Sequence, residues 1–318
     1  MIALHTSDIE LVIKKHKVEI DLFISEAKAN LIALLKRKGL LKREKKYLQR
    51  IIDNFDDIVL SSPDGFKKWK EDIGKIPPPP KLRKGVMNLS ERIIHALGYK
   101  KLRTSFYPKY FQLIGINSCV YCNSQLTVAI DSKSKGKNVV KAKFQVDHYI
   151  PKSLYPFLSI SLYNLYPVCA SCNNVKGGKE VYFKLYSSNI NDTKKSDFKF
   201  KLEDGCAAKF SKKKDIDEIK ITFIEPTQSI SFNDTFDILG IYNTQKDLVE
   251  ELIHKSEIYT KSYKDNLIKS FPKIFSNESV TNRIIIGNYS FPNEIHNRPM
   301  SKFVQDIAED LGLIPLNR

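Results

Sequence analysis

Two pairs of cysteines, each with two residues between its members, are the first feature of this sequence that could do chemistry. Cys119 pairs with Cys122, and Cys169 with Cys172. In a chain with no recognisable secretory signal, such pairs are typical of thiolate ligands to Zn²⁺ rather than of disulfides. Four thiolates complete the tetrahedral shell of structural zinc, so we expect a structural Zn²⁺ site. The remaining cysteine, Cys206, is expected to be an ordinary half-buried side chain.

A second group of polar residues lies between or directly after the cysteine pairs: Asp147, His148, Asn164 and Asn173. A histidine with a pKa near ~6.5 can take a proton from a water molecule at neutral pH. Carboxylate and amide oxygens suit Mg²⁺ or Mn²⁺. Taken singly, each asparagine could also be a cap or a turn residue.

The order of these residues resembles the HNH endonucleases, whose fold is the ββα-metal finger. The pattern of that family is an Asp-His pair at the end of a strand, a proline soon after it, an asparagine in the next loop, and an asparagine or histidine early in a helix. In many members, cysteine pairs bracket the motif. The resemblance covers roughly residues 115–180. Besides the four paired cysteines, it rests on these residues: Asp147, His148, Pro151, Asn164, Asn173 and Lys176.

The resemblance implies a role for each residue of the motif. His148 would be the general base, and Asp147 and Asn173 would be ligands of a catalytic Mg²⁺ or Mn²⁺. Asn164 would brace the loop and orient His148. Lys176 would contact a phosphate next to the one that is cleaved.

The charge of the chain indicates a polyanionic partner. There are 52 Lys and Arg residues against 36 Asp and Glu, a net charge of +16. Residues 1–118 carry +11, residues 119–185 carry +6 and residues 186–318 carry −1. Such a field favours nucleic acid, with Lys152 and Lys176 as candidate contacts, although a lysine-rich helix can also be merely solvated. DNA is the expected substrate, and RNA is not excluded, since a site of this kind does not by itself read the 2′-hydroxyl.

The elements that must position these residues predict an α+β fold. The ββα-metal HNH finger with its four-cysteine zinc site would be flanked by a helical N-terminal region and a mixed α/β C-terminal region. Apolar residues recur at helical spacing through residues 1–60. Four consecutive prolines, Pro77–Pro80, are typical of a stiff extended spacer. The predicted regions are 1–75 (basic helical), 76–81 (proline-rich linker), 82–185 (HNH domain) and 186–318 (C-terminal accessory region).

Further elements follow from local patterns. Short strands are expected at 125–130 and 143–146, with a polar loop at 131–138 between them. In the C-terminal region, strands are expected at 198–202 and 219–224, and helices at 244–254, 258–270 and 301–311.

Composition excludes several classes of protein. A hydrophobic fraction of 42% and an aromatic fraction of 11% exclude a disordered chain. No apolar run reaches the ~18 residues that a membrane-spanning helix needs. With no secretory signal, we expect the cytoplasm and no membrane partner. The resemblance implies that the cell is bacterial.

The most specific functional hypothesis is therefore a metal-dependent HNH endonuclease that hydrolyses DNA. Single HNH centres usually nick one strand, so cleavage of both strands would need a homodimer or a partner. Large regions on both sides of the motif resemble restriction or anti-phage defence nucleases, such as the nuclease of a Septu-like system, which works with an ATPase partner. The alternative is a zinc-ribbon module that binds nucleic acid without catalysis. This alternative does not explain why Asp147, His148 and Asn173 occur together.

Overall fold

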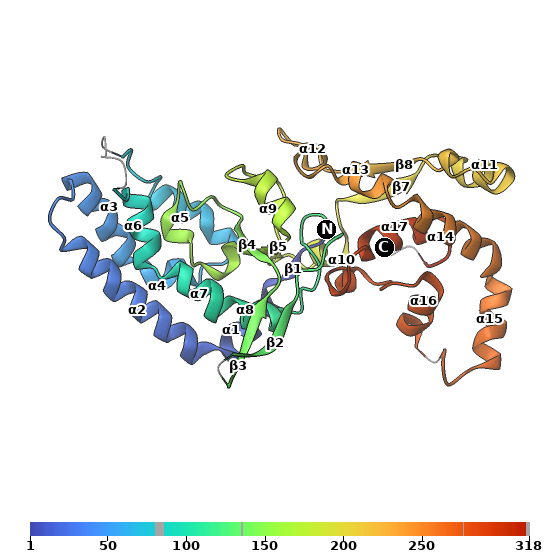
Figure 1. Ribbon diagram of the computed structural model, residues 1–318, viewed down its shortest axis with the longest axis horizontal. Coiled ribbons are helices and arrows are strands. Elements are labelled where there is room, and N and C mark those ends of the chain that lie inside the picture. The colour runs from blue at the N-terminus through green and yellow to red at the C-terminus, as the bar shows by residue number, and fades with distance from the viewer. Residues whose placement is uncertain (80–85, 135, 276, 316–318) are drawn as a thin grey trace.

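The structure, a computed structural model, describes residues 1–79, 86–134, 136–275 and 277–315 of the chain. The molecule is elongated, with the N-terminal helices at one end and the C-terminal helices at the other (Figure 1). Helices make up most of the regular structure, and the strands of the described residues pair into four two-stranded sheets. The protein is therefore mixed α+β, as its sequence predicts.

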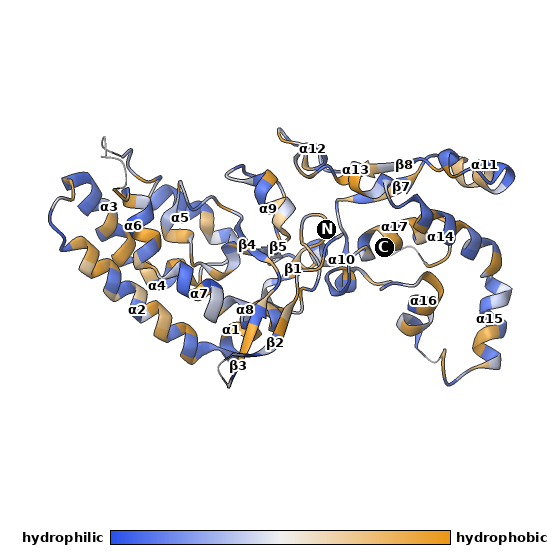
Figure 2. Ribbon diagram, in the orientation of Figure 1, coloured by the Kyte–Doolittle hydropathy of each residue, from blue (hydrophilic) through white to orange (hydrophobic). Residues whose placement is uncertain are grey.

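The N-terminal region is helical because its apolar residues recur every three or four positions. Helix α2 (Lys17–Leu35) buries Ile20, Phe23 and Ala27 on one side, and hydrophobic and hydrophilic bands alternate along it in Figure 2. The N-terminus of α3 is capped by the Glu44 carboxylate, which accepts the backbone N–H of Leu41 at 2.8 Å. The helices of this region are α1 (Thr6–Lys15), α2, α3 (Lys42–Asp53), α4 (Phe55–Val59), α5 (Phe66–Asp72), α6 (Leu89–Ala96), α7 (Tyr99–Ser105) and α8 (Tyr107–Ile114).

The proline-rich segment has no regular secondary structure over residues 76–79. It is tied to the body of the protein at two points: the backbone N–H of Ile76 donates to Leu154 at 2.9 Å, and the Arg43 guanidinium donates to the carbonyl of Pro78 at 2.9 Å. The last residues of the predicted linker, Pro80 and Lys81, lie outside the described residues.

A hairpin precedes the motif strands, and here the sequence-based expectation is wrong. Strands β2 (Ala129–Ser134) and β3 (Lys137–Ala142) pair antiparallel, so most of the predicted polar loop at 131–138 is strand. The polar residues are tolerated because most side chains of these strands are exposed or half-buried.

Strands β4 (Gln145–His148) and β5 (Leu165–Val168) pair antiparallel, and helix α9 (Ala170–Lys176) follows directly. Asp147 lies opposite Tyr166 in this pairing. The last two residues of β4 are the Asp-His pair, and α9 contacts β4. This strand–strand–helix unit lies near the middle of the molecule (Figure 1).

The C-terminal region continues the same core. Strand β1 (Leu4–His5) pairs in parallel with β6 (Tyr186–Ser187), and β7 (Lys199–Leu202) pairs antiparallel with β8 (Ile221–Ile224). Buried hydrophobic residues form one cluster that extends from Met1 to Ile314. The boundaries proposed from the sequence stay a prediction. The helices here are α10 (Asn191–Lys194), α11 (Cys206–Lys213), α12 (Phe232–Phe236), α13 (Ile238–Asn243), α14 (Lys246–Ile258), α15 (Lys261–Ser270), α16 (Glu278–Ile286) and α17 (Ser301–Asp310).

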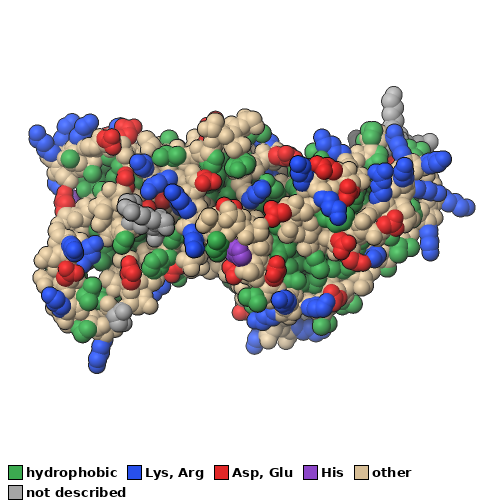
Figure 3. Space-filling view, turned by 180° about the vertical axis from the view of Figure 1, so that it is seen from behind, with side chains coloured by type: hydrophobic (Ala, Val, Ile, Leu, Met, Phe, Trp, Pro, Cys, Tyr) green, Lys and Arg blue, Asp and Glu red, His purple; other side chains and the backbone are tan. Residues whose placement is uncertain are grey.

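Basic side chains are not gathered in a single patch on the face shown in Figure 3. They lie over both ends of the molecule, with acidic side chains among them. On this face, the positive charge therefore does not mark a single binding surface.

Candidate functional site

The four paired cysteines meet in one buried cluster. Their sulfur atoms all lie within 4.8 Å of one another. Cys119 and Cys122 belong to a tight turn that the backbone N–H of Asn123 closes on the carbonyl of Cys119 at 2.8 Å. Cys169 is the N-cap of α9, and Cys172 lies in the first turn of that helix. A local turn and a helix start thus bring together ligands that are far apart in the sequence.

The sulfur atoms of the cluster accept hydrogen bonds, as zinc-bound thiolates do. The backbone N–H of Cys169 donates to Cys119 Sγ at 3.3 Å, and that of Cys172 donates to Cys169 Sγ at 3.4 Å. Burial raises the pKa of Cys119, because a lone thiolate is costly inside the protein. A bound Zn²⁺ removes that cost by taking the thiolate as a ligand. The donor set and its spacing fit Zn²⁺, so the cluster can hold a zinc ion.

Asn123 joins this cluster to the C-terminal region. It adopts a left-handed backbone conformation, with φ at 52°, and is buried. Its amide nitrogen donates to Ser118 Oγ at 2.7 Å and to the carbonyl of Ile295 at 2.9 Å. Its amide oxygen accepts the backbone N–H of Lys302 at 2.9 Å, and its own carbonyl accepts that of Met300. The first cysteine turn is therefore held by a segment near the end of the chain.

Asp147 is buried and already has two partners. Lys176 Nζ lies 2.9 Å from its Oδ2, and the Tyr121 hydroxyl donates to the same oxygen at 2.7 Å. Lys176 Nζ also donates to the backbone carbonyl of His148 at 2.9 Å. The exposed fractions of the Lys176 and Asp147 side chains are only 1% and 6%. Lys176 thus lies inside the molecule as a counter-ion of Asp147, and its expected contact with a phosphate stays a prediction.

His148 is also buried, and its ring has a defined tautomer. Nε2 lies 3.0 Å from the carbonyl oxygen of Ser159, which can only accept, so Nε2 carries the hydrogen. In the neutral ring Nδ1 is then the acceptor, and the Lys152 ammonium faces it at 3.3 Å. Burial and then the Lys152 charge lower the pKa of His148 well below its ordinary value. The imidazole is therefore neutral at pH 7, with its lone pair on Nδ1.

Asn164 braces the loop between β4 and β5. Its Oδ1 accepts the backbone N–H of Ile150 at 2.7 Å, and its Nδ2 donates to the carbonyls of Ile150 and Leu158 at 3.1 and 3.0 Å. The backbone N–H of Tyr149 also donates to the carbonyl of Asn164. These bonds fix the chain that follows His148 and leave the amide of Asn164 inside the loop.

Asn173 lies on α9, half-buried, and its amide has a fixed orientation. Its Nδ2 donates to Oε1 of Gln145, which is two residues before Asp147 on β4. Alternate residues of a strand share a face, so Gln145 and Asp147 both face the side that α9 covers. Since Gln145 takes the N–H side of the amide, the oxygen of Asn173 has no hydrogen-bond partner in the described part of the chain and is left for another ligand.

The structure thus gathers the motif residues around one end of the strand–strand–helix unit, but the side chains of Asp147 and His148 contact different groups. Lys176 links the two, through the carboxylate of one and the backbone of the other. The residues that the sequence reasoning missed are Tyr121, Gln145 and Tyr99, whose ring lies 5.0 Å from that of His148. Period-two spacing from Asp147 could have identified Gln145; the two tyrosines gave no local signal.

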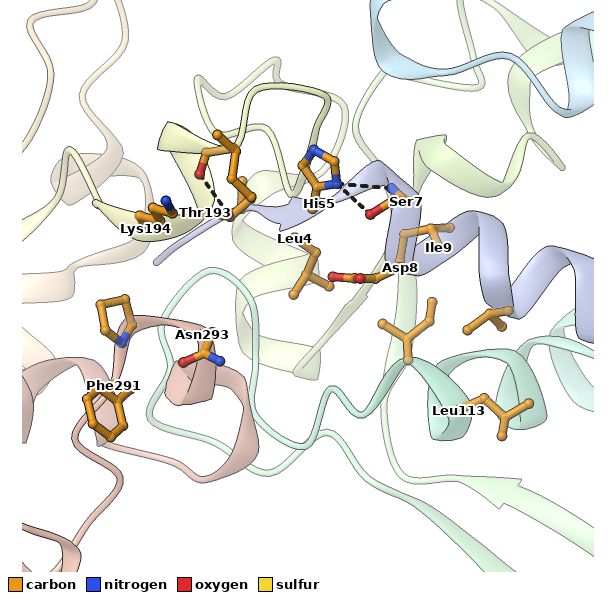
Figure 4. Close-up of a pocket in the computed structure, with 15 residues that line it drawn as sticks. Leu4, His5, Ser7, Asp8, Ile9, Leu113, Thr193, Lys194, Phe291 and Asn293 are labelled. Atoms are coloured by element: carbon orange, nitrogen blue, oxygen red, sulfur yellow. Dashed lines mark hydrogen bonds between the residues drawn. The ribbon is translucent and has the colours of Figure 1, made fainter. Parts of the chain in front are cut away.

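A separate cavity of about 780 Å³ lies between α1, the end of α8, α10 and the turn at Pro292–Asn297 (Figure 4). His5 lines it, with Ser7 Oγ 2.6 Å from its Nδ1 and the carbonyl of Ser188 3.1 Å from its Nε2. His5 is the N-cap of α1 and accepts the backbone N–H of Ser7. The arrangement is therefore that of a helix cap, and the cavity shares no lining residue with the motif.

Comparison with known proteins gives one partial similarity. The chain is 39% identical over 61 residues to Septu protein PtuB from Bacillus thuringiensis, which is 19% of this chain and 20% of that protein. The match thus spans about a fifth of the length of the curated relative. No family model and no solved structure matches the chain. Among the described residues, no helix has the length and apolar character that a membrane span requires.

Proposed function

We propose that the protein is a metal-dependent HNH endonuclease that hydrolyses phosphodiester bonds of DNA. The observation that carries this proposal is the strand–strand–helix unit itself. It ends β4 on Asp147-His148, begins α9 at the cysteine cluster, and directs Asn173 toward β4. A zinc ribbon that only binds nucleic acid gives no reason for a buried carboxylate, a neutral histidine and an oriented amide at one strand end.

The residues present fit a catalytic Mg²⁺ or Mn²⁺. Among the described residues, Asp147 Oδ1 has no hydrogen-bond partner, and the Asn173 oxygen is left open by the Gln145 contact. Both are hard oxygen donors of the kind these ions prefer. Asp147 and Asn173 would hold the ion, which would supply charge neutralisation at the phosphate and help for the leaving oxygen.

Side chains of the protein would accept the proton of the attacking water and would place positive charge beside the phosphate. His148 Nδ1 would accept the proton of the attacking water, with Nε2–H held on Ser159 so that the ring cannot turn. For this, water must replace the Lys152 ammonium at Nδ1. Lys152 would then be free to contact a phosphate oxygen. Lys176 would stay beside Asp147 and add a positive charge close to the reacting phosphate.

The biological setting we propose is bacterial anti-phage defence, in the cytoplasm. It rests on the partial similarity to Septu protein PtuB. A homodimer, or a complex with an ATPase partner that holds two copies of this chain, would bring a second centre for the second strand.

The test is plasmid cleavage with Mg²⁺ or Mn²⁺, with EDTA as a control. We expect nicking or linearisation by the wild-type protein and its loss in His148→Ala, with zinc content and DNA binding unchanged. The half-exposed His254 provides the matched variant His254→Ala, which should cleave like wild type. Full activity in His148→Ala would eliminate the general-base assignment. Metal-independent binding without any cleavage, alone or with the ATPase partner, would favour the zinc-ribbon alternative.

A further inference from the structure

A groove of about 690 Å³ lies beside the motif strands. It is bounded by α5 and the turn before it, the loop after β4, and the segments at 180–184 and 228–230. Tyr149, which directly follows His148, lines it. The Tyr149 ring stacks on that of Tyr166, which lies opposite Asp147 in the β4–β5 pairing. Residues directly opposite each other on paired strands share a face of the sheet, so the groove lies on the side of the sheet that Asp147 faces.

Aromatic rings form much of this groove. The Tyr149 ring stacks on that of Tyr166, with centroids 5.7 Å apart and an interplanar angle of 18°. Tyr155 also lines the groove, and the Lys70 ammonium lies 5.3 Å from the centre of its ring. Tyr182 is 51% exposed. Tyr155 is buried, so the half-buried Tyr149 and the exposed Tyr182 are the rings that offer faces on which nucleobases stack.

The segment after α9 contributes an aromatic ring and an ammonium group to the groove. Tyr182 and Lys184 are exposed and line the groove, together with the buried Val181. The ring and the ammonium therefore reach the same space. Among the described residues, Lys184 has no ion-pair partner, which leaves its charge for a ligand.

The charges of the groove discriminate between possible nucleic-acid ligands. Lys67, Lys70 and Lys184 provide positive charge for phosphates, but Glu71 and Glu180 also line the groove. A carboxylate repels the backbone of a duplex, yet it accepts hydrogen bonds from the amino groups of bases. Base edges reach a carboxylate of a duplex-binding protein only through the grooves of the helix, and aromatic rings can stack on bases only where these are unpaired. The mixture of rings, carboxylates and ammonium groups therefore fits an unpaired nucleotide better than the outside of a double helix.

We propose that this groove binds unpaired nucleotides of the strand that is cleaved, so that the substrate is single-stranded or locally unwound nucleic acid. The inference rests on the proposed nuclease function, since it uses the position of the groove beside Asp147 and His148. The bases would stack on Tyr149 and Tyr182 while Lys184 contacts a phosphate. The strand next to the cleaved bond would then be held by its bases rather than by a paired helix.

The experiment measures binding without cleavage. Fluorescein-labelled 20-nucleotide DNA, as a single strand or as a duplex, is titrated with wild-type protein, Tyr182→Ala and Lys184→Ala without added divalent metal, and fluorescence anisotropy is read. Loss of one stacking ring should weaken single-strand binding by roughly 5- to 100-fold. The matched variants Tyr263→Ala and Lys261→Ala, on the exposed helix α15, should bind as wild type does. Single-stranded RNA of the same sequence forms a further arm. Tighter RNA binding that Tyr182→Ala weakens supports the groove and assigns RNA to it.

Two results would overturn the inference. One is single-strand binding that is unchanged in both groove variants. The other is a duplex bound at least as tightly as the single strand and equally weakened by Tyr182→Ala. Neither result depends on catalysis, so failure of the groove is separate from failure of the nuclease, which the His148→Ala cleavage assay detects. A protein that binds single strands through the groove but never cleaves would retain the groove and lose the proposed function.

Discussion

Replacing Lys176 by methionine gives the sharpest test of how the candidate site is built. Its ammonium lies 2.9 Å from Asp147 Oδ2, and the two side chains are 1% and 6% exposed. At that distance the Coulomb attraction is about 6 kcal/mol for an effective dielectric constant of ~20. Much of this offsets the loss of hydration, but removing one partner leaves the other charge buried alone. We therefore expect Lys176→Met to lower the free energy of unfolding by about 3–5 kcal/mol.

The assay is urea denaturation in EDTA-free buffer, followed by the fluorescence of the single tryptophan, Trp69, and by circular dichroism. The double variant Lys176→Met/Asp147→Asn removes both charges, so it should lose less stability than the two single variants together. Lys101 and Glu26 provide the matched control, with the same kind of contact at 2.8 Å but exposed fractions of 65% and 51%. Lys101→Met should cost less than about 1 kcal/mol. Equal effects of Lys176→Met and Lys101→Met would refute the argument from burial.

Three further variants test other parts of the structure. Cys169→Ser should lower the zinc content and the melting temperature, whereas Cys206→Ser should retain the zinc. Metal analysis and thermal unfolding measure both quantities. A Cys169→Ser protein with full zinc content would contradict the zinc site. Asn123→Ala leaves the buried N–H of Lys302 without a partner and removes one hydrogen bond from the carbonyl of Ile295, so it should destabilise the protein by about 2–4 kcal/mol in urea, against no measurable change for the exposed Asn174→Ala. Burial lowers the pKa of His296 to about 4 from its ordinary 6.5, so the neutral ring stabilises the fold fully above pH 6.5, and this contribution, about 3 kcal/mol, is lost as the pH falls toward 4. His296→Leu should remove that part of the pH dependence, and an unchanged slope of stability between pH 6.5 and 4 would disprove it.

The cysteine cluster was predictable because its signal is local. The two-residue spacing within each pair favours a local turn that brings its two sulfur atoms together. A tetrahedral zinc ion needs four ligands, so the two pairs are expected to meet. The same holds for α2, whose buried residues follow the helical repeat. Local patterns of this kind need no knowledge of what packs against them.

The environment of Asp147 was not predictable in the same way. A lysine near the end of a short helix is expected at the surface, since ammonium groups are seldom fully buried. Lys176 is buried because a carboxylate on β4, 29 positions earlier, comes to lie beside it, and Tyr121 from the first cysteine turn completes the contact. Only the tertiary structure places these three groups together.

The hairpin β2–β3 shows a further limit. Its polar residues favour a loop by composition, but pairing of Asp131 with Val140 and of Ser134 with Lys137 makes most of it strand. Gly136, with φ at 77°, helps to make the tight turn between the strands. Because the paired residues are polar and largely exposed, their sequence lacks the alternation of apolar and polar residues by which a strand is predicted.

The bonds around Asn123 have a consequence for how the protein matures during synthesis. The partners of its side chain lie 172 and 179 positions later in the chain, at Ile295 and Lys302. A ribosome completes the motif strands and both cysteine pairs long before it reaches these residues. The first cysteine turn therefore acquires its final hydrogen bonds only at the end of translation, and contacts of such long range form slowly. Incomplete chains would contain the motif but lack the hydrogen bonds that Ile295 and Lys302 make to Asn123. Truncation after residue 290 should therefore weaken the retention of zinc, although every cysteine is present.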